Sequence, residues 1–303
     1  MQPLFVLHPR PPYAFDTLLA FVRRYAHPVL HHAHADAYRH ILRIDDRLAL
    51  IEVRSHGTTN APQLAVNLLA ATDDIPIDVL QSRLAHILAI DVDRASFFEY
   101  ANQHQPLASV IAPLHGLPLL RTDDLFEALM CVIIEQQIAW KTALRAQRWL
   151  LEWAGHRLDH DSQPYYAFPT PAQIAAASVD DLKPLKITFG RMRLMISLAE
   201  QVASGQLDLA SLTTLSPLDC YHALLKLKGI GHWTAAVIVS RAMGRSPLIT
   251  YNDVALQAAV NYLFFDKEGR TTPEAVQQVF APLGDYAAEA ADYTLIRWVF
   301  ERY

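Results

Sequence analysis

The sequence is poor in cysteine. Its 303 residues include two, Cys131 and Cys220, and both stand among apolar residues of segments with helical periodicity. Two thiols cannot supply the four cysteine ligands of an iron–sulfur cluster, so that kind of centre is excluded. Free thiols in apolar surroundings are expected to be buried, and they suit a reducing compartment, so a cytoplasmic location is expected.

Long apolar runs and an excess of positive charge are also missing. No run approaches the length of a membrane-spanning helix and no signal peptide is visible, so no membrane partner is expected. The net charge of −5 argues against a generic nucleic-acid coat protein. The chain is 52% hydrophobic and 19% charged, which predicts a globular protein with room for two domains.

The residue pattern predicts an α+β fold in two parts. Residues 1–110 are expected to form a small domain with an antiparallel sheet, and residues 111–303 a larger all-α domain. Residues 105–122, which hold prolines and a glycine, are interpreted as a connector. Strands are expected at 38–43, 48–54 and 62–69, with a turn at Asp45-Asp46, and helices at 15–25, 79–88, 123–154, 171–178, 190–204, 217–227, 233–243, 253–264, 273–280 and 286–301.

One segment near the C-terminal end, L-K-G-I-G-H-W-T-A from 227 to 235, suggests a function. Ser216 and Pro217 suit the start of a helix before it, and Gly229 suits that helix's C-terminal cap. A second helix begins directly after Gly231, so its unpaired amides are expected to point out of the turn, where they can bind a phosphate oxygen. On its own, this pattern is more typical of an ordinary helical hairpin.

A carboxylate, Asp253, follows this segment at the start of another predicted helix. In isolation it is predicted to be an N-cap. That role is compatible with catalysis, because a helix N-terminus stabilises negative charge.

Together, the hairpin and the aspartate resemble the helix-hairpin-helix DNA base-excision glycosylases, the HhH-GPD superfamily, and most closely the AlkA-type 3-methyladenine DNA glycosylases. The resemblance covers residues 115–300 and implies that the N-terminal sheet domain has a TATA-binding-protein-like shape. It implies damaged double-stranded DNA as the partner and, in a bacterium, association with the nucleoid; action as a monomer is expected. Three further stretches are similar to family segments: F-E-A-L-M-C-V-I-I-E-Q-Q-I-A-W-K-T-A (126–143), F-P-T-P-A-Q-I-A-A-A (168–177) and L-K-I-T-F-G-R-M-R-L-M-I-S-L-A (185–199).

The resemblance implies a role for each part of the site. Asp253 is the expected catalytic carboxylate, and Gln137, with Ile138 beside it, is expected to fill the gap left by an extruded base, where the family often has leucine. No cofactor is required, although a monovalent cation is implied at the backbone carbonyls of Leu225, Leu227 and Ile230. Contacts with DNA are expected from Gly229, Ile230, Gly231, His232, Thr234, Gln136, Lys228 and Arg191.

An aromatic pocket is implied for the base. Alkylated purines such as 3-methyladenine and 7-methylguanine carry positive charge, which electron-rich rings attract. Trp233 is the first candidate, with a core tryptophan as the competing interpretation, and Trp298, Tyr293 and Tyr286 are further candidates near the last helix. Relatives that also nick the strand have a nucleophilic lysine where Trp233 stands; an indole forms no Schiff base, so a monofunctional glycosylase that leaves an abasic site is expected.

Other interpretations stay open. The lesion is alternatively a neutral base such as hypoxanthine, uracil or oxidised guanine, or the chain is a DNA-binding protein that kept the hairpin without catalysis. His31, His32 and His34 permit a zinc or nickel site, although solvated loop histidines are preferred because no cysteine accompanies them. Eight Lys or Arg against three acids in residues 183–245 fit a DNA-contacting surface or a solvated helix face.

Overall fold

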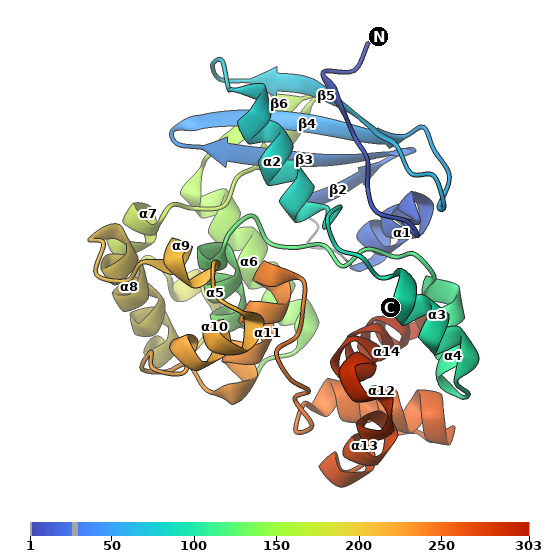
Figure 1. The fold of residues 1–303 in the computed structure, drawn as a ribbon. Helices are drawn as coiled ribbons and strands as arrows, with labels where there is room; N and C mark the ends of the chain where they lie inside the picture. Colours follow the sequence, from blue (N-terminus) through green and yellow to red (C-terminus); the bar gives the residue numbers. More distant parts are fainter. Residues whose placement is uncertain (1, 26–29, 303) are drawn as a thin grey trace.

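The computed structural model describes residues 2–25 and 30–302 and consists of a five-stranded antiparallel sheet above a larger helical body (Figure 1). The predicted α+β class is confirmed, and so are the hairpin at Asp45 and the third strand. Two further strands, β1 and β2, extend the sheet at its edges. In the order β1-β5-β4-β3-β2, the strands are β1 (Phe5–Leu7), β5 (Leu64–Ala71), β4 (Arg47–Ser55), β3 (Ala37–Ile44) and β2 (His31–His34).

Side-chain alternation gives the sheet two different faces. Tyr38 of β3 and Ile51 of β4 point to the face covered by helices α1 (Phe15–Tyr25) and α2 (Ile77–Ile87), where they are fully buried. On the other face, Arg39 and Glu52 lie directly opposite each other and form an ion pair of 2.8 Å between Nε and Oε2.

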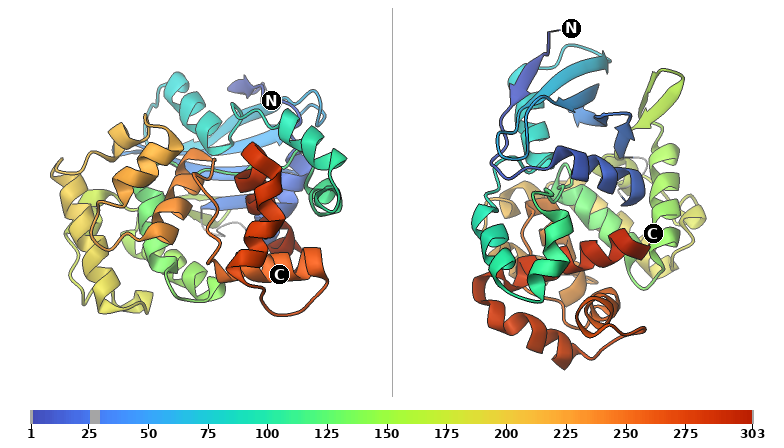
Figure 2. Two further views of the ribbon diagram at one scale, coloured as in Figure 1. Left: turned by 60° about the horizontal axis from the view of Figure 1, so that its bottom comes forward. Right: turned by 90° about the vertical axis from the view of Figure 1, so that its right-hand side faces the viewer.

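This second face is covered by a hairpin from the helical body, made of β6 (Arg157–His160) and β7 (Gln163–Tyr166). Figure 2 shows it rising beside the sheet. Tyr165 is fully buried against Ile41 and Leu50, and its hydroxyl accepts a hydrogen bond of 3.0 Å from Arg39. The hairpin, which the sequence pattern did not predict, therefore attaches the sheet to the helices.

The helical body matches most of the predicted segments. Thr170 and Thr272 cap their helices ahead of Pro171 and Pro273, as these prolines predict. The helices after α2 are α3 (Ala95–Gln103), α4 (Leu107–Ile111), α5 (Leu125–Glu135), α6 (Trp140–Ala154), α7 (Pro171–Ala175), α8 (Phe189–Ala203), α9 (Leu209–Leu212), α10 (Pro217–Leu224), α11 (His232–Met243), α12 (Val254–Phe265), α13 (Pro273–Phe280) and α14 (Ala287–Arg302).

Two predictions about this body are wrong. The helix expected over residues 123–154 is two helices, α5 and α6, because the chain breaks at residues 136–139 and Gln137 takes a positive φ of 54°. The connector expected at 105–122 contains α4, whose apolar residues are buried. None of the helices in residues 2–25 and 30–302 combines the length and the apolar character that crossing a bilayer needs.

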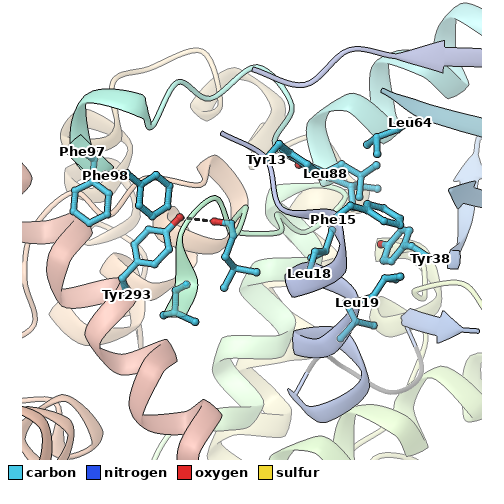
Figure 3. Packing of buried hydrophobic residues seen from close by; sticks show 14 of the residues in the cluster. Tyr13, Phe15, Leu18, Leu19, Tyr38, Leu64, Leu88, Phe97, Phe98 and Tyr293 are labelled. Atoms are coloured by element: carbon cyan, nitrogen blue, oxygen red, sulfur yellow. Dashed lines mark hydrogen bonds between the residues drawn. The ribbon is translucent and has the colours of Figure 1, made fainter. Parts of the chain in front are cut away.

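The apolar packing forms two main clusters. The first joins the sheet and α1–α4 to α12–α14, which come from the other end of the chain; Figure 3 shows part of it, with Tyr293 of α14 against Phe97 and Phe98 of α3. The second is built by helices α5–α11. The domain limits 1–110 and 111–303 stay a prediction. The chain crosses from the second cluster to the first between α11 and α12, where Asp253 lies.

Candidate active site

The predicted helical hairpin is present. Ser216 caps α10 by accepting a hydrogen bond from the amide of Asp219, and Pro217 occupies the first position. The helix ends at Leu224, three residues before the predicted end, so Gly229 lies in the turn rather than at the helix cap. Glycine is required there: φ is +88°, and a Cβ would stand 2.8 Å from Leu194 Cδ2.

The outer side of the turn is open. Gly231 is the N-cap of α11, and a Cβ built on it would meet nothing within 4 Å. Gly229, Gly231 and His232 are exposed, and so is Lys228, whereas the Ile230 side chain is buried and anchors the turn. The amides of the first turn of a helix have no partner within the helix, so this exposed end can bind a phosphate oxygen.

Two side chains stabilise the hairpin from within. The Tyr221 hydroxyl of α10 and Nδ1 of His232 in α11 lie 2.6 Å apart, within hydrogen-bonding distance. Thr234, expected to contact DNA, is 4% exposed, and its Oγ1 accepts a 3.0 Å hydrogen bond from Gln136 Nε2. The structure therefore pairs these two side chains with each other, with Gln136 partly exposed, and the DNA contacts of Thr234 and Gln136 stay a prediction.

The Asp253 carboxylate caps α12 and faces the hairpin helix. Oδ1 accepts hydrogen bonds from the amides of Ala255 (2.7 Å) and Leu256 (3.2 Å), and Oδ2 accepts one of 2.6 Å from the indole Nε1 of Trp233. The side chains of Asp253 and Trp233 are both partly exposed. The expected N-cap is thus confirmed, and the carboxylate is held by three donors while solvent still reaches it.

This contact joins the two apolar clusters. Trp233 packs on the cluster of α5–α11, whereas Asp253 caps the helix whose Leu256 and Val260 belong to the other cluster. Binding sites often lie where two packed bodies of a protein meet. A separate cavity of about 910 Å³ lies between α2, α5 and α9, and neither Asp253 nor Trp233 lines it.

Two of the four predicted pocket aromatics pack against helix α3. Tyr293 is fully buried among Phe97 and Phe98, and its hydroxyl donates to the Leu117 carbonyl (Figure 3), so a base has no access to it. Tyr286 precedes α14 and packs on Tyr100, with ring centroids 4.7 Å apart. The burial of Tyr293 contradicts its expected pocket role, whereas Tyr286 is partly exposed and its role stays a prediction.

Trp298 is placed differently. Its ring lies under the Arg302 guanidinium at 5.4 Å, and the same guanidinium lies 5.2 Å from the ring of Tyr262, toward the C-terminal end of α12. Asp253 caps the opposite end of that helix. The contacts of the described residues therefore bring Trp233 alone, of the four candidates, to the carboxylate.

The loop between α5 and α6 presents Gln137. Its side chain is exposed, and Ile138 beside it is partly buried in the second cluster. Arg191, expected to contact DNA, donates from Nη1 to the carbonyls of Ile134 (3.2 Å) and Gln136 at the end of α5. Its guanidinium thus satisfies the end of α5, as cations do at helix C-termini, and its contact with DNA stays a prediction.

An ion pair near this loop, between buried Glu135 and partly exposed Arg241, is absent from the sequence prediction. Arg241 of α11 donates to both carboxylate oxygens of Glu135, at 2.6 and 2.7 Å. A lone acid in the apolar segment M-C-V-I-I-E and a lone arginine in V-I-V-S-R-A-M are the signal that points to it, since buried charges need partners.

The prediction that the three neighbouring histidines lie in a loop is wrong. His31, His32 and His34 lie on edge strand β2 rather than in a loop. His31 Nδ1 is 2.7 Å from the Tyr38 hydroxyl, and its ring stacks on His40. Within the described residues no three His, Cys, Asp or Glu side chains form a group that would hold a metal ion.

The segment that leads to Asp253 is anchored to α14. The Ser246 hydroxyl lies 2.8 Å from Oδ2 and 2.9 Å from Oδ1 of Asp292. Burial raises the pKa of Asp292 to about 7, against the opposing effect of the Ser246 hydrogen bond.

Replacing Asp292 by asparagine should therefore stabilise the protein at about pH 8, by up to roughly 4 kcal/mol at about 1.4 kcal/mol per pKa unit. The pKa of Asp292 in the folded state lies above the ordinary aspartate value of 3.8, so the wild type loses stability as the pH rises from about 4 to about 7. Asparagine does not titrate, and the gain should vanish near pH 4. Denaturant unfolding at both pH values measures it; an equal difference at both would contradict the assignment.

Comparison with known proteins agrees with this geometry. A family model described as "HhH-GPD superfamily base excision DNA repair protein" matches residues 130–283, which is 154 of the 303 residues. A DNA-3-methyladenine glycosylase of Bacillus subtilis is 26% identical over 204 residues, covering 67% of each chain. Matches to two further curated relatives span 63% and 49% of those proteins' lengths.

Solved structures share the fold. A 3-methyladenine DNA-glycosylase of Archaeoglobus fulgidus superposes with a TM-score of 0.79 at 18% identity, covering 99% of this chain and 98% of that one. An 8-oxoguanine glycosylase/lyase of Clostridium acetobutylicum in complex with double-stranded DNA has a TM-score of 0.72 at 16% identity, covering 99% of each chain. The hairpin and Asp253 lie within or beside the matched segments, and the chain belongs to the HhH-GPD superfamily of base excision DNA repair proteins.

Proposed function

We propose that this protein is a monofunctional DNA glycosylase that acts as a monomer on double-stranded DNA. It hydrolyses the N-glycosidic bond of an extruded alkylated purine and leaves an abasic site. The observation that carries the proposal is the Trp233–Asp253 contact: it holds a solvent-accessible carboxylate beside the first turn of the helix that opens from the hairpin.

The chemistry follows from that placement. A stacked base is out of reach of a carboxylate, so the nucleotide must first rotate out of the duplex. Cleavage of the base–sugar bond then develops positive charge on the sugar, which an ionised Asp253 stabilises. The base leaves with the bonding electrons, and a water molecule, with Asp253 as general base, supplies the new oxygen on C1′.

The residues favour a cationic lesion. A methylated purine that carries positive charge leaves as a neutral base, so no second acid is needed to protonate it. The partly exposed indole of Trp233 stands beside Asp253, where an electron-rich ring attracts such a base. The Bacillus subtilis relative is named for 3-methyladenine, in keeping with this substrate class.

The reaction ends at the abasic site. Cutting the strand through a Schiff base needs an amine beside the sugar, and position 233 carries an indole. Lys226 and Lys228 are exposed ahead of the turn, where they are suited to phosphate contacts. Gln137, exposed on its loop, fills the space left by the base, with Ile138 behind it.

A monovalent cation fits the turn when DNA is bound. The carbonyl oxygen of Leu227 accepts the Ile230 amide at 3.1 Å, and no amide of the described residues donates to the carbonyls of Leu225 or Ile230. Carbonyl oxygens suit hard cations. Bound there, the cation would add positive charge next to the phosphate that the turn holds.

The test is release of free bases from duplexes that carry one defined lesion. We expect release of 7-methylguanine and 3-methyladenine at least about a hundredfold faster than release of hypoxanthine, uracil or 8-oxoguanine, because neutral bases need hydrogen bonds that an aromatic pocket does not supply. Faster release of a neutral lesion would show that the substrate is a neutral base and not an alkylated purine. DNA binding without release of any base would show that the protein is a DNA-binding protein without glycosylase activity.

A further inference from the structure

The loop that carries Gln137 is held in a costly conformation. A positive φ of 54° is unfavourable for a residue with a Cβ, and such conformations persist where surrounding contacts determine them. Gln137 itself is exposed, so the determining contacts come from its neighbours in the sequence.

Those contacts fasten the loop to both ends of helix α11. Near its first turn, Thr234 Oγ1 accepts the 3.0 Å hydrogen bond from Gln136. Near its last turn, Arg241 forms the bidentate ion pair with Glu135, the final residue of α5. The hairpin opens the same helix, so α11 connects the turn that faces outward to the loop that presents Gln137.

Neighbouring side chains fix the positions of both partners of this ion pair. The Glu135 side chain is 7% exposed and that of Arg241 32%. Gln147 of α6 donates a 2.8 Å hydrogen bond to Glu135 Oε1, and the Arg241 guanidinium lies 5.7 Å from the centre of the Trp140 ring, at the start of α6. Residues on both sides of the loop are thus locked to one guanidinium.

Stability alone does not account for such a pair. Burying a charge such as that of Glu135 costs free energy of desolvation, and replacing buried ion pairs by neutral residues of similar volume is often neutral or stabilising. A bidentate arginine does, however, fix distance and orientation, which lysine cannot reproduce.

We propose that Glu135 and Arg241 are positioning residues that make the hairpin and the Gln137 loop one rigid unit, so that gripping the strand places Gln137 in the gap left by the extruded base. This inference rests on the proposed function for its substrate. It concerns neither Asp253 nor the bond that is cleaved.

The test is the double variant Glu135→Gln/Arg241→Met, with the folded state checked by its thermal midpoint. Insertion is read from the fluorescence of 2-aminopurine placed next to a tetrahydrofuran abasic analogue in a duplex. We expect the insertion equilibrium, and single-turnover release of 7-methylguanine, to fall by about 10- to 100-fold, as for other residues that orient a site from behind. Affinity for undamaged duplex should stay within about threefold, because the hairpin is intact.

The matched control is the buried pair of the sheet, Arg39 and Glu52, whose side chains are 6% and 8% exposed. The double variant Glu52→Gln/Arg39→Met should leave insertion unchanged. Arg241→Lys keeps the positive charge but loses the bidentate contact with Glu135. This variant replaces the first double variant if that one does not fold, and we expect an intermediate loss of insertion.

Unchanged insertion in a folded variant overturns the proposal, and so does an equal loss of affinity for undamaged duplex, which would indicate a purely structural role. The abasic analogue has no base to release. Insertion that depends on Glu135 and Arg241 in a protein without base release would therefore sink the proposed function and leave this inference standing.

Discussion

Replacing Asp253 by asparagine should lower the rate of base release by about a thousandfold or more. In the proposed mechanism the carboxylate stabilises the positive charge on the sugar, and removing one preorganised electrostatic partner costs a reaction about 100- to 1000-fold. Its added role as a general base for water enlarges the loss. Single-turnover release of 7-methylguanine from a defined duplex measures the effect.

This substitution spares the fold, which makes the result interpretable. Asparagine is as good an N-cap as aspartate, so its side-chain oxygen can still accept the amide hydrogen bonds of Ala255 and Leu256. The thermal midpoint and the affinity for a duplex with an abasic-site analogue should remain close to the wild-type values. A variant that keeps the wild-type rate would remove Asp253 from the chemistry.

Replacing Trp233 by phenylalanine has the second largest expected effect. The change keeps an aromatic ring but deletes the indole N–H, which donates the 2.6 Å hydrogen bond to Asp253 Oδ2. A carboxylate without its orienting partner should lose about 10- to 100-fold in single-turnover rate, in line with other outer partners of catalytic groups. Binding of the abasic analogue should change little.

Trp153 provides the control for this experiment. It stacks on Trp149 in α6, in the same apolar cluster as Trp233, but its partner is another tryptophan rather than a carboxylate. Trp153→Phe should leave the rate unchanged. Equal losses in the two variants would mean that Trp233 matters for packing and not for the orientation of Asp253.

The local signals in the sequence were sufficient for the hairpin. Ser216, Pro217 and the two glycines of the turn act through backbone preferences that operate within a few residues, and the N-cap role of Asp253 has the same origin. The family match, to residues 130–283, agrees with this segment. Local backbone preferences therefore predict where the hairpin turn and the Asp253 carboxylate lie.

What the sequence could not give are contacts between distant segments. Tyr293 was a candidate for the base pocket, and its burial follows from α3, nearly two hundred residues earlier in the chain. Arg191 lies on a basic helix, and its hydrogen bond to a carbonyl at the end of α5 could not be read from the sequence. The break at Gln137 is similar, because the tertiary contacts of Glu135 and Gln136 override the helical periodicity of the segment.

The most direct test of the account combines the two substitutions at the site. If Trp233 acts by holding Asp253, the double variant Asp253→Asn/Trp233→Phe should release 7-methylguanine no more slowly than Asp253→Asn alone, because the group that Trp233 orients is already gone. Losses that multiply, about a further 10- to 100-fold in the double variant, would contradict the claim that this contact is the catalytic centre.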